Sequence, residues 1–206
     1  MSQARAHGDG EGRLITLEGL DGSGKSTVLA GLRERHPAWT FTCEPTGSWY
    51  GDAVRRSVGS ETADPIAELF LFIADHAEHL RTTVRPTLAS DGVVVSDRYI
   101  DSRVAYQAVT LTGVIDDPAR FIWGVHEPFT ILPDLTVFLD VDPETAAERA
   151  GATNKFEQVA HLRQVRRRYE TIIAGAPERF ARVDAAAAPE AVLTAVETAI
   201  DAVVQR

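Results

Sequence analysis

The sequence predicts an α/β fold with a mainly parallel, five-stranded sheet, and three observations support this prediction. Stretches typical of strands alternate with stretches typical of helices along the chain, which is the order found in folds built on a parallel sheet. Residues 92–96 and 134–141 are continuous apolar runs, as in strands covered on both faces. With 206 residues, of which 44% are hydrophobic, the chain can bury the core of one domain.

Each predicted strand is a short, mostly apolar run beside glycine, proline or polar turn residues. In chain order the strands are 13–18, 39–43, 92–96, 134–141 and 180–183. No internal repeat and no interdomain linker separates them. We therefore expect a flexible polar N-terminus at 1–12 and a single domain over 13–206.

The helices are predicted from start signals and from helical periodicity. Asp64–Pro65 and Asp142–Pro143 each place an N-cap acid before a proline at the first helical position. Behind Pro65, apolar residues recur at helical spacing and predict a buried face. This face consists of Ile66, Leu69, Phe70, Ile73, Ala77, Leu80 and Val84. Further helices are predicted at 26–35, 157–174 and 189–205.

The composition restricts the classes of partner. Asp and Glu total 30 against 21 Lys and Arg, a net charge of -9, so we expect no nucleic-acid partner. No apolar run approaches the ~18 residues that a membrane span needs, and residues 1–12 contain no apolar signal segment. We therefore expect a cytoplasmic protein without a membrane partner. The single cysteine, Cys43, excludes an internal disulfide.

Only two lysines, Lys25 and Lys155, occur in this acidic chain. Carboxylate-rich surfaces keep proteins soluble at high salt, so the acidic, lysine-poor composition indicates a salty cytoplasm. The alternative explanation for the few lysines is a GC-rich genome that replaces Lys by Arg. Lysine and arginine are not interchangeable, so each remaining lysine is a candidate functional residue.

Residues 19–26 match G-x-x-x-x-G-K-[ST], the phosphate-binding loop (P-loop), between a predicted strand and a predicted helix. Its glycines allow backbone N–H groups to surround phosphate oxygens, and the helix directs its positive end to the same place. Lys25 can reach the β- and γ-phosphates, and the Ser26 hydroxyl can bind Mg²⁺. The predicted phosphate-binding residues are Gly19, Leu20, Asp21, Gly22, Ser23, Gly24, Lys25, Ser26 and Thr27.

The reaction is not determined by this loop alone, because kinases, GTPases and motor ATPases share it. A GTPase would also carry an Asn-Lys-x-Asp motif, whereas Asn154–Lys155 is followed by Phe156–Glu157. The length of the chain and its basic residues outside the loop favour a small kinase with a second phosphate pocket.

Two further groups of residues predict this second pocket. Asp97 and Arg98 follow the strand 92–96, at the sheet edge where ligands bind, so Asp97 can hold a Mg²⁺-bound water and Arg98 a phosphate. A surface ion pair is the alternative. Phe72 and His76 stand at i and i+4, so the Phe72 ring can stack on a planar base with the polar tip of His76 next to it. The alternative is that Phe72 packs in the core and His76 is solvated.

Side chains on two further segments are candidates for the wall of this pocket. Ser102, Tyr106 and Gln107 lie about one turn apart if their segment is helical. Arg55 and Arg56 are candidates for an acceptor phosphate, or else are solvated helix residues.

Together these motifs resemble the thymidylate kinase family, over roughly residues 13 to 203. The matching segments, in order, are 17–27, 44–46, 71–75, 97–99, Ser102, 105–107, 133–136, 139–141 and 155–157. The last segment and the acidic, lysine-poor composition are most similar to archaeal members, halophilic ones included. The resemblance implies a three-layer P-loop nucleoside-monophosphate-kinase-like fold, a homodimer, and the transfer of the ATP γ-phosphoryl group to dTMP with Mg²⁺.

The resemblance also implies roles for residues around the acceptor. Arg55 and Arg98 hold the dTMP phosphate, Phe72 stacks on thymine, and Tyr106 crowds the 2′ position of the sugar. The expected substrate-binding residues are Asp21, Glu44, Pro45, Arg55, Phe72, His76, Arg98, Ser102, Tyr106 and Gln107.

For the donor, the resemblance places Arg149 beside adenine and makes 150–157, with Lys155, a lid over ATP. The expected catalytic residues are Asp21, Lys25 and Arg98, and the expected metal ligands are Ser26 and Asp97.

Three departures from the family pattern concern cations. His76 stands where the family usually has a thymine-contacting Arg, and Cys43 stands where an Arg usually precedes Glu-Pro. The lid is short and carries only Lys155. The alternatives to a thymidylate kinase are a kinase of the same fold for another nucleotide or a deoxynucleoside, and a nucleotide-binding protein without transfer activity.

Overall fold

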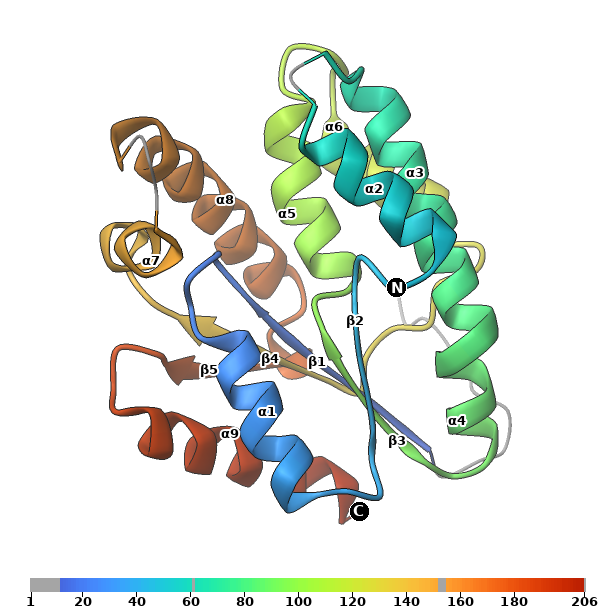
Figure 1. Cartoon of the computed structure of the whole chain (residues 1–206), viewed down its shortest axis with the longest axis vertical. Helices are drawn as coiled ribbons and strands as arrows, with labels where there is room; N and C mark the ends of the chain where they lie inside the picture. Colours follow the sequence, from blue (N-terminus) through green and yellow to red (C-terminus); the bar gives the residue numbers. More distant parts are fainter. Residues whose placement is uncertain (1–11, 61, 152–154, 206) are drawn as a thin grey trace.

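The computed structural model describes residues 12–60, 62–151 and 155–205, and shows one five-stranded sheet with helices on both faces (Figure 1). The strands are β1 (Arg13–Gly19), β2 (Thr40–Cys43), β3 (Val93–Asp97), β4 (Leu135–Asp140) and β5 (Phe180–Asp184). Their order in the sheet is β2-β3-β1-β4-β5, and every neighbouring pair is parallel. The predicted fold class is confirmed, and each predicted strand is present with its ends shifted by about a residue.

The register of the strands brings the ends of β1, β2 and β3 to one edge of the sheet. Leu17 pairs with Asp97, and Cys43 pairs with the same aspartate. The loops that follow these strands therefore start side by side. In open parallel sheets this carboxyl edge is where ligands bind.

Two helices cover one face of the sheet, and the others cover the opposite face or its carboxyl edge (Figure 1). The first pair is α1 (Lys25–Arg35) and α9 (Pro189–Val204). The others are α2 (Trp49–Val58), α3 (Pro65–His79), the π-helical η1 (Leu80–Val84), α4 (Arg85–Ala89), α5 (Ile100–Thr110), α6 (Pro118–His126), α7 (Pro143–Ala150), α8 (Lys155–Gly175) and the 3₁₀-helical η2 (Pro177–Arg179).

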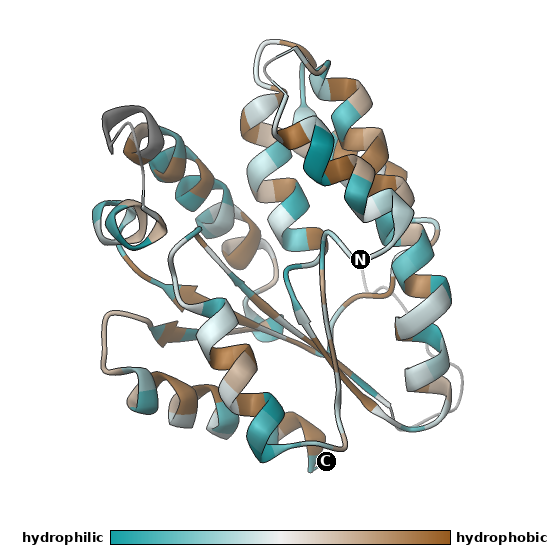
Figure 2. Ribbon diagram, in the orientation of Figure 1, coloured by the Kyte–Doolittle hydropathy of each residue, from teal (hydrophilic) through white to brown (hydrophobic). Residues whose placement is uncertain are grey.

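The core lies on both faces of the sheet because successive strand residues point to opposite sides. Leu14 and Val94 are fully buried among residues of α3 and α5, whereas Ile15, Leu17 and Val95 are fully buried with residues of α1 and α9. Figure 2 shows the apolar strands at the centre and mixed surfaces on the helices around them. The two apolar layers hold the carboxyl edge of the sheet as a rigid platform.

Helix α3 starts as predicted and buries Leu69 and Ile73 of the expected face, but the buried stripe also includes His76 and leaves out Phe70. The Asp64 carboxylate accepts hydrogen bonds from the backbone N–H groups of Ile66 and Ala67, at 3.0 and 2.8 Å. Phe70, expected on the buried face, is 49% exposed, while His76 is fully buried. Hydropathy does not reveal this stripe, because an imidazole is buried only where partners for its nitrogens exist.

Among the described residues, none of the helices has the length and apolar character that crossing a membrane requires. Residues 1–11 of the expected N-terminal segment, residues 152–154 of the expected lid and the side chain of Lys155 lie outside what the structure describes.

Candidate active site

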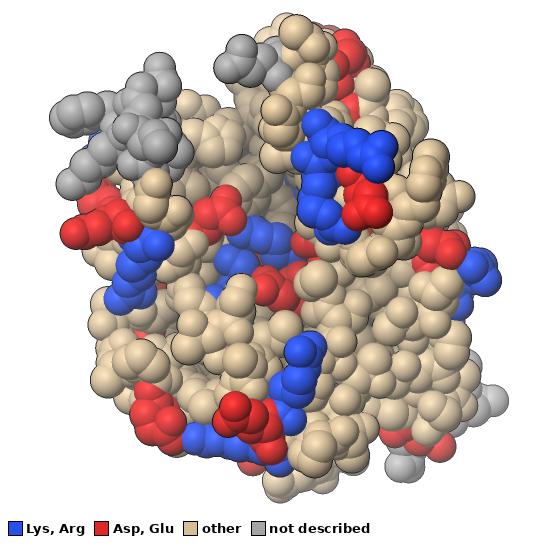
Figure 3. Space-filling view, viewed as in Figure 1, with Lys and Arg blue, Asp and Glu red and all other residues tan. Residues whose placement is uncertain are grey.

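A hollow lined by charged side chains opens at the carboxyl edge of the sheet (Figure 3). It comprises three adjoining cavities of about 480, 380 and 260 Å³, which we call the acceptor, phosphate and donor cavities. Asp21 and Arg98 line both the acceptor and the phosphate cavity. Gly24, Thr27 and Arg149 line both the phosphate and the donor cavity. The three cavities are therefore joined in a row, with the P-loop in the middle.

The P-loop has the backbone conformation that its glycines permit. Gly22 and Gly24 have φ angles of 82° and 94°, in the left-handed region that favours glycine. A Cβ atom on Gly22 would stand 2.1 Å from the carbonyl oxygen of Ala146, so α7 also requires a glycine here. Helix α1 begins at Lys25, directly after the loop, and directs its free N–H groups toward the phosphate cavity.

Lys25 is buried at the centre of the loop. Its Nζ donates to the carbonyl oxygens of Gly19 and Leu20, at 3.1 and 2.8 Å, and to Ser23 Oγ at 3.3 Å. Burial, followed by the positive charge of Arg98, lowers the pKa of Lys25 to about 7. An anion in the phosphate cavity favours the charged ammonium.

Ser26 and Asp97 provide oxygen atoms that fit a magnesium ion. Ser26 Oγ donates to Asp97 Oδ2 at 3.3 Å, and both residues line the phosphate cavity. The second oxygen, Asp97 Oδ1, is buried and has no hydrogen-bond partner among the described residues. A buried carboxylate oxygen without a partner is costly, and Mg²⁺ takes one or two protein oxygens together with water and phosphate oxygens. The expected pair of metal ligands is thus brought together.

Arg98 stands at the wall that the acceptor and phosphate cavities share. Its guanidinium donates to Asp21 Oδ1 at 2.6 Å and to Ser102 Oγ at 2.9 Å, and lies 4.9 Å from the centre of the Tyr106 ring. The backbone of Arg98 has φ 68°, a conformation that a side chain adopts only at a cost. Strain of this kind concentrates at functional sites, where the surrounding contacts maintain it.

Glu18 lies beneath Arg98 and was not among the expected site residues. It accepts hydrogen bonds from the backbone N–H of Tyr99 at 2.9 Å, from Tyr169 Oη at 2.8 Å and from Ser102 Oγ. Burial, followed by the charge of Asp101, raises the pKa of Glu18 to about 7. Its contacts fix Ser102, which in turn orients Arg98. A carboxylate at the end of a buried strand, one residue before the P-loop, was the sequence signal for it.

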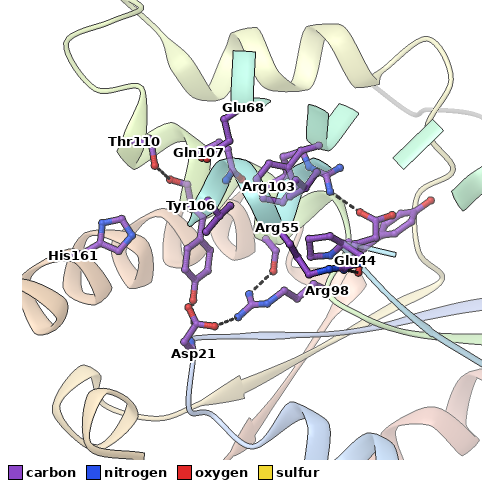
Figure 4. A pocket seen from close by; sticks show the side chains of 16 residues that line it. Asp21, Glu44, Arg55, Glu68, Arg98, Arg103, Tyr106, Gln107, Thr110 and His161 are labelled. Carbon is purple, nitrogen blue, oxygen red and sulfur yellow. Dashed lines mark hydrogen bonds and ion pairs between the residues drawn. The ribbon is translucent and has the colours of Figure 1, made fainter. Parts of the chain in front are cut away.

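The acceptor cavity contains every expected substrate-binding residue except His76 (Figure 4). Its lining residues are Asp21, Glu44, Pro45, Val54, Arg55, Val58, Glu68, Phe72, Arg98, Tyr99, Ser102, Arg103, Tyr106, Gln107, Thr110 and His161. Tyr106 Oη accepts a hydrogen bond from the backbone N–H of Asp21 at 2.9 Å, which connects α5 to the P-loop. The Arg55 guanidinium is held by the carbonyl oxygens of Pro45 and Thr46, at 3.2 and 2.8 Å.

His76 lies in a layer behind the acceptor cavity, which corrects the expectation that it contacts the base. Its Nδ1 is 2.8 Å from Glu44 Oε1, and its Nε2 is 2.6 Å from Thr130 Oγ1. Both ring nitrogens are thus engaged with the protein. The ring faces Glu44 in the loop after β2 and does not line the acceptor cavity.

Glu44 is the centre of a buried polar cluster that also contains His76, His79 and Arg103. His79 Nδ1 is 2.7 Å from Glu44 Oε1, and an Arg103 N–H donates to Glu44 Oε2 at 2.6 Å. Burial alone would raise the pKa of Glu44, but the charges of His76 and Arg103 and the histidine hydrogen bonds outweigh it and hold this pKa well below its usual range. Glu44 is therefore an ionised carboxylate with its oxygens occupied.

Arg103 is a second residue that we did not expect. It is buried in the wall of the acceptor cavity, and its guanidinium carbon lies 5.2 Å from the centre of the Phe72 ring. The sequence contained a signal for it. Arg103 precedes Gln107, a predicted wall residue, by four positions on the same helix, so both project from one side of α5.

One further expected residue, Arg149, lines the donor cavity. Arg149, at the end of α7, donates to the carbonyl oxygen of Ala185 at 2.9 Å and lines this cavity with Val192 of α9. The cavity is small and is lined by apolar as well as polar residues, among them Ser23 and Gly24 of the P-loop.

Comparison with known proteins supports one family. The family model described as "Thymidylate kinase" matches residues 17–196. A "Probable thymidylate kinase" of Natronomonas pharaonis is 57% identical over 195 residues, covering 94% of this chain and all of the relative. The proteins of the same name from Halorubrum lacusprofundi and Methanosarcina acetivorans are 56% and 47% identical, and cover 89% and 95% of this chain. These matches cover 95% and 98% of the two relatives.

Proposed function

The chain belongs to the thymidylate kinase family, and on that premise we propose that it transfers the γ-phosphoryl group of ATP to dTMP, giving ADP and dTDP for dTTP synthesis. The observation that carries this proposal is the row of three cavities. Arg98 and Asp21 form the wall between the acceptor and phosphate cavities, so the two nucleotides meet there. In-line transfer requires this end-to-end arrangement.

The acceptor oxygen of dTMP already carries negative charge, so its attack needs no strong general base. Catalysis then consists of positioning and of neutralising the charge of the transferring group. In this proposal Lys25, which lines the phosphate cavity, binds the β- and γ-phosphates, and Arg98 and Arg55, which line the acceptor cavity, bind the phosphate of dTMP. Asp21 holds Arg98 and is proposed to contact the sugar of dTMP.

We propose that Ser26 and Asp97 hold the magnesium ion that accompanies ATP, because their oxygens converge on the phosphate cavity. The bound cation supplies charge neutralisation at the phosphates. Asp97 Oδ1, which is otherwise without a partner among the described residues, can accept from a water of the ion.

We also propose that residues 150–157 form the lid over ATP, with Arg149 at its base and Lys155 as a second cation. Closure of the lid would exclude water and suppress hydrolysis of ATP. Arg149 supports this proposal, because it lines both the donor and the phosphate cavity.

The proposed homodimer draws support from exposed aromatic side chains at the start of α2. Trp49 and Tyr50 are 71% and 37% exposed. Large exposed apolar groups favour a contact surface, and a second copy of the chain is the proposed occupant. Light scattering of the purified protein measures the mass, and a monomer would contradict this assignment.

A phosphorylated acceptor is favoured over a nucleoside such as thymidine. A nucleoside 5′-hydroxyl must lose a proton, and Glu44 is the carboxylate that the sequence offers for this step. Both carboxylate oxygens of Glu44 accept hydrogen bonds from N–H donors. Burial alone would raise the pKa of Glu44, but the neighbouring charges and hydrogen bonds hold this pKa well below its usual range. A carboxylate stabilised in this way is a weak base.

The test is an assay of ADP release from ATP and Mg²⁺, with dTMP, dUMP, dCMP, dGMP and thymidine as separate acceptors, at low and at molar KCl. We expect dTMP to give the highest kcat/KM. Turnover led by another acceptor would preserve the kinase fold and overturn the substrate. ATP binding without turnover of any acceptor would indicate a nucleotide-binding protein instead.

The base is expected to stack on Phe72, so Phe72→Ala should raise the KM for dTMP about tenfold or more, from a stack of ~1–3 kcal/mol. The matched control is Phe70→Ala, which removes an exposed ring of the same helix outside the cavity. An equal KM for the Phe72 variant and the wild type would contradict the stacking role.

The affinity for ATP is expected to fall as the pH rises from 7 to 9. In the free protein, burial and then Arg98 lower the pKa of Lys25 to about 7, so the ammonium loses its proton above this pH. Phosphate groups favour the charged form, so ATP binding takes up a proton above pH 7 and weakens by up to about tenfold per pH unit. Calorimetry at pH 8 in two buffers of different ionisation enthalpy measures this uptake. Lys25→Met is the control, and uptake that persists in it would assign the proton to another group.

A further inference from the structure

The wall of the acceptor cavity contains a buried guanidinium whose position the proposed chemistry does not explain. Arg103 is on α5, one turn before Gln107 (Figure 4). Phe72, on α3, lines the same cavity. The guanidinium carbon of Arg103 lies 5.2 Å from the centre of the Phe72 ring. Phe72 and Arg103 both line the acceptor cavity, so a planar base that packs against this ring has the guanidinium beside it.

The protein uses only part of the hydrogen-bonding capacity of Arg103. One N–H of Nη2 donates to Glu44 Oε2 at 2.6 Å, and Nη1 is 3.4 Å from His126 Nε2. The Nε–H is buried and has no partner among the described residues. A guanidinium has five N–H donors and no acceptor, so donors remain for a ligand.

His126 is arranged to accept from Arg103. Its Nδ1 is 2.8 Å from the carbonyl oxygen of Ile122, which only accepts, so Nδ1 carries the proton and Nε2 faces Arg103. Burial, followed by the charge of Arg103, lowers the pKa of His126 to about 3 and keeps it neutral. The ring therefore orients the guanidinium without repelling it.

The surroundings of Arg103 fix it in place. Glu44 neutralises its charge, and Glu44 is in turn held by His76 and His79. Ion pairs buried this deeply give little net stability compared with apolar packing of the same volume. A cluster of this kind at the wall of a cavity is better explained by the ligand that the cation contacts.

We propose that Arg103 reads the base of the acceptor, by donating to the 4-carbonyl of a keto pyrimidine. This inference rests on the proposed function and specifies its substrate class. Thymine and uracil present a carbonyl oxygen at this position, whereas cytosine presents an amino group, which is a donor. Two donors facing each other leave both unpaired in a buried site, so Arg103 favours dTMP and dUMP and disfavours dCMP.

The experiment compares the affinities of dTMP, dUMP and dCMP, measured by calorimetry, for the wild type, Arg103→Met and Arg103→Lys. The Met variant keeps the length of the stem but offers no donor. The Lys variant keeps the positive charge beside Glu44, which preserves the fold, but lacks the planar fork. We expect both variants to lose about tenfold to a hundredfold in affinity for dTMP and for dUMP, and little for dCMP.

The matched control is Arg33→Met. Arg33 lies 5.5 Å from the Phe41 ring, so it forms the same kind of arginine–phenylalanine pair, but it is exposed on α1 and outside the cavities. All affinities should be unchanged in this variant. Equal losses for dTMP and dCMP in the Arg103 variants, or no loss, would overturn the inference and leave the proposed function intact. A wild type that binds no dTMP would overturn the proposed function itself.

Discussion

Replacing Lys25 by alanine is expected to lower kcat for dTMP phosphorylation by about 10³-fold or more. Lys25 is the cation of the P-loop, and its ammonium is held 2.8 Å from the carbonyl oxygen of Leu20, where its three donors can turn from the loop to the phosphates. The charge that it neutralises grows in the transition state, so the loss should appear in kcat at saturating ATP and not only in KM. Rapid-quench measurement of dTDP gives this value directly.

The matched control is Arg33→Ala, which removes one positive charge from the same helix at an exposed position outside the cavities. It should keep the activity of the wild type. The melting temperature and the affinity for dTMP separate a catalytic loss from unfolding, because Lys25 does not line the acceptor cavity. A Lys25→Ala variant with near-wild-type kcat would mean that the P-loop assignment is wrong.

The P-loop and the sheet could be predicted because they depend on local patterns. The motif at 19–26 requires glycines at positions of positive φ, and the structure has φ 82° at Gly22 and 94° at Gly24. The continuous apolar runs became β3 and β4, which are covered on both faces. Strand order follows from hydrogen-bond registers between distant segments, so no local pattern contains it.

The polar layer around the acceptor could not be predicted in the same way. Apolar periodicity on α3 placed Phe70 on the buried face and His76 beside it, whereas Phe70 is half exposed and His76 is fully buried. The deciding partner is Glu44, more than thirty residues earlier, whose oxygen is 2.8 Å from His76 Nδ1. Helical spacing from Gln107 indicates the side of α5 on which Arg103 lies, but its burial there depends on Glu44 and on Phe72. Pairing in three dimensions, not hydropathy, determines which polar residues are buried.

Both a local sequence pattern and contacts between distant segments determine the position of Arg98. Replacing Arg98 is the second change for which we expect a large effect. Arg98→Ala should lower kcat/KM for dTMP by about 10³-fold, because the guanidinium connects Asp21 of the P-loop with Ser102 of α5 and is the group that we propose to bind the acceptor phosphate. Arg98→Lys should recover only a small part of this loss. A lysine is a point charge, and it cannot hold Asp21 and Ser102 while it also binds a phosphate through two parallel hydrogen bonds.

A comparison of Arg98→Gly with Arg98→Ala separates the side chain from the strained backbone beneath it. At φ 68° glycine is unstrained and alanine is not, so the glycine variant should unfold at the higher temperature of the two. Both lack the guanidinium, so both should lose activity to the same extent. If the glycine variant were instead much more active than the alanine variant, the strained backbone would be responsible for the loss. The proposed binding of the dTMP phosphate would then pass from Arg98 to Arg55, which also lines the acceptor cavity.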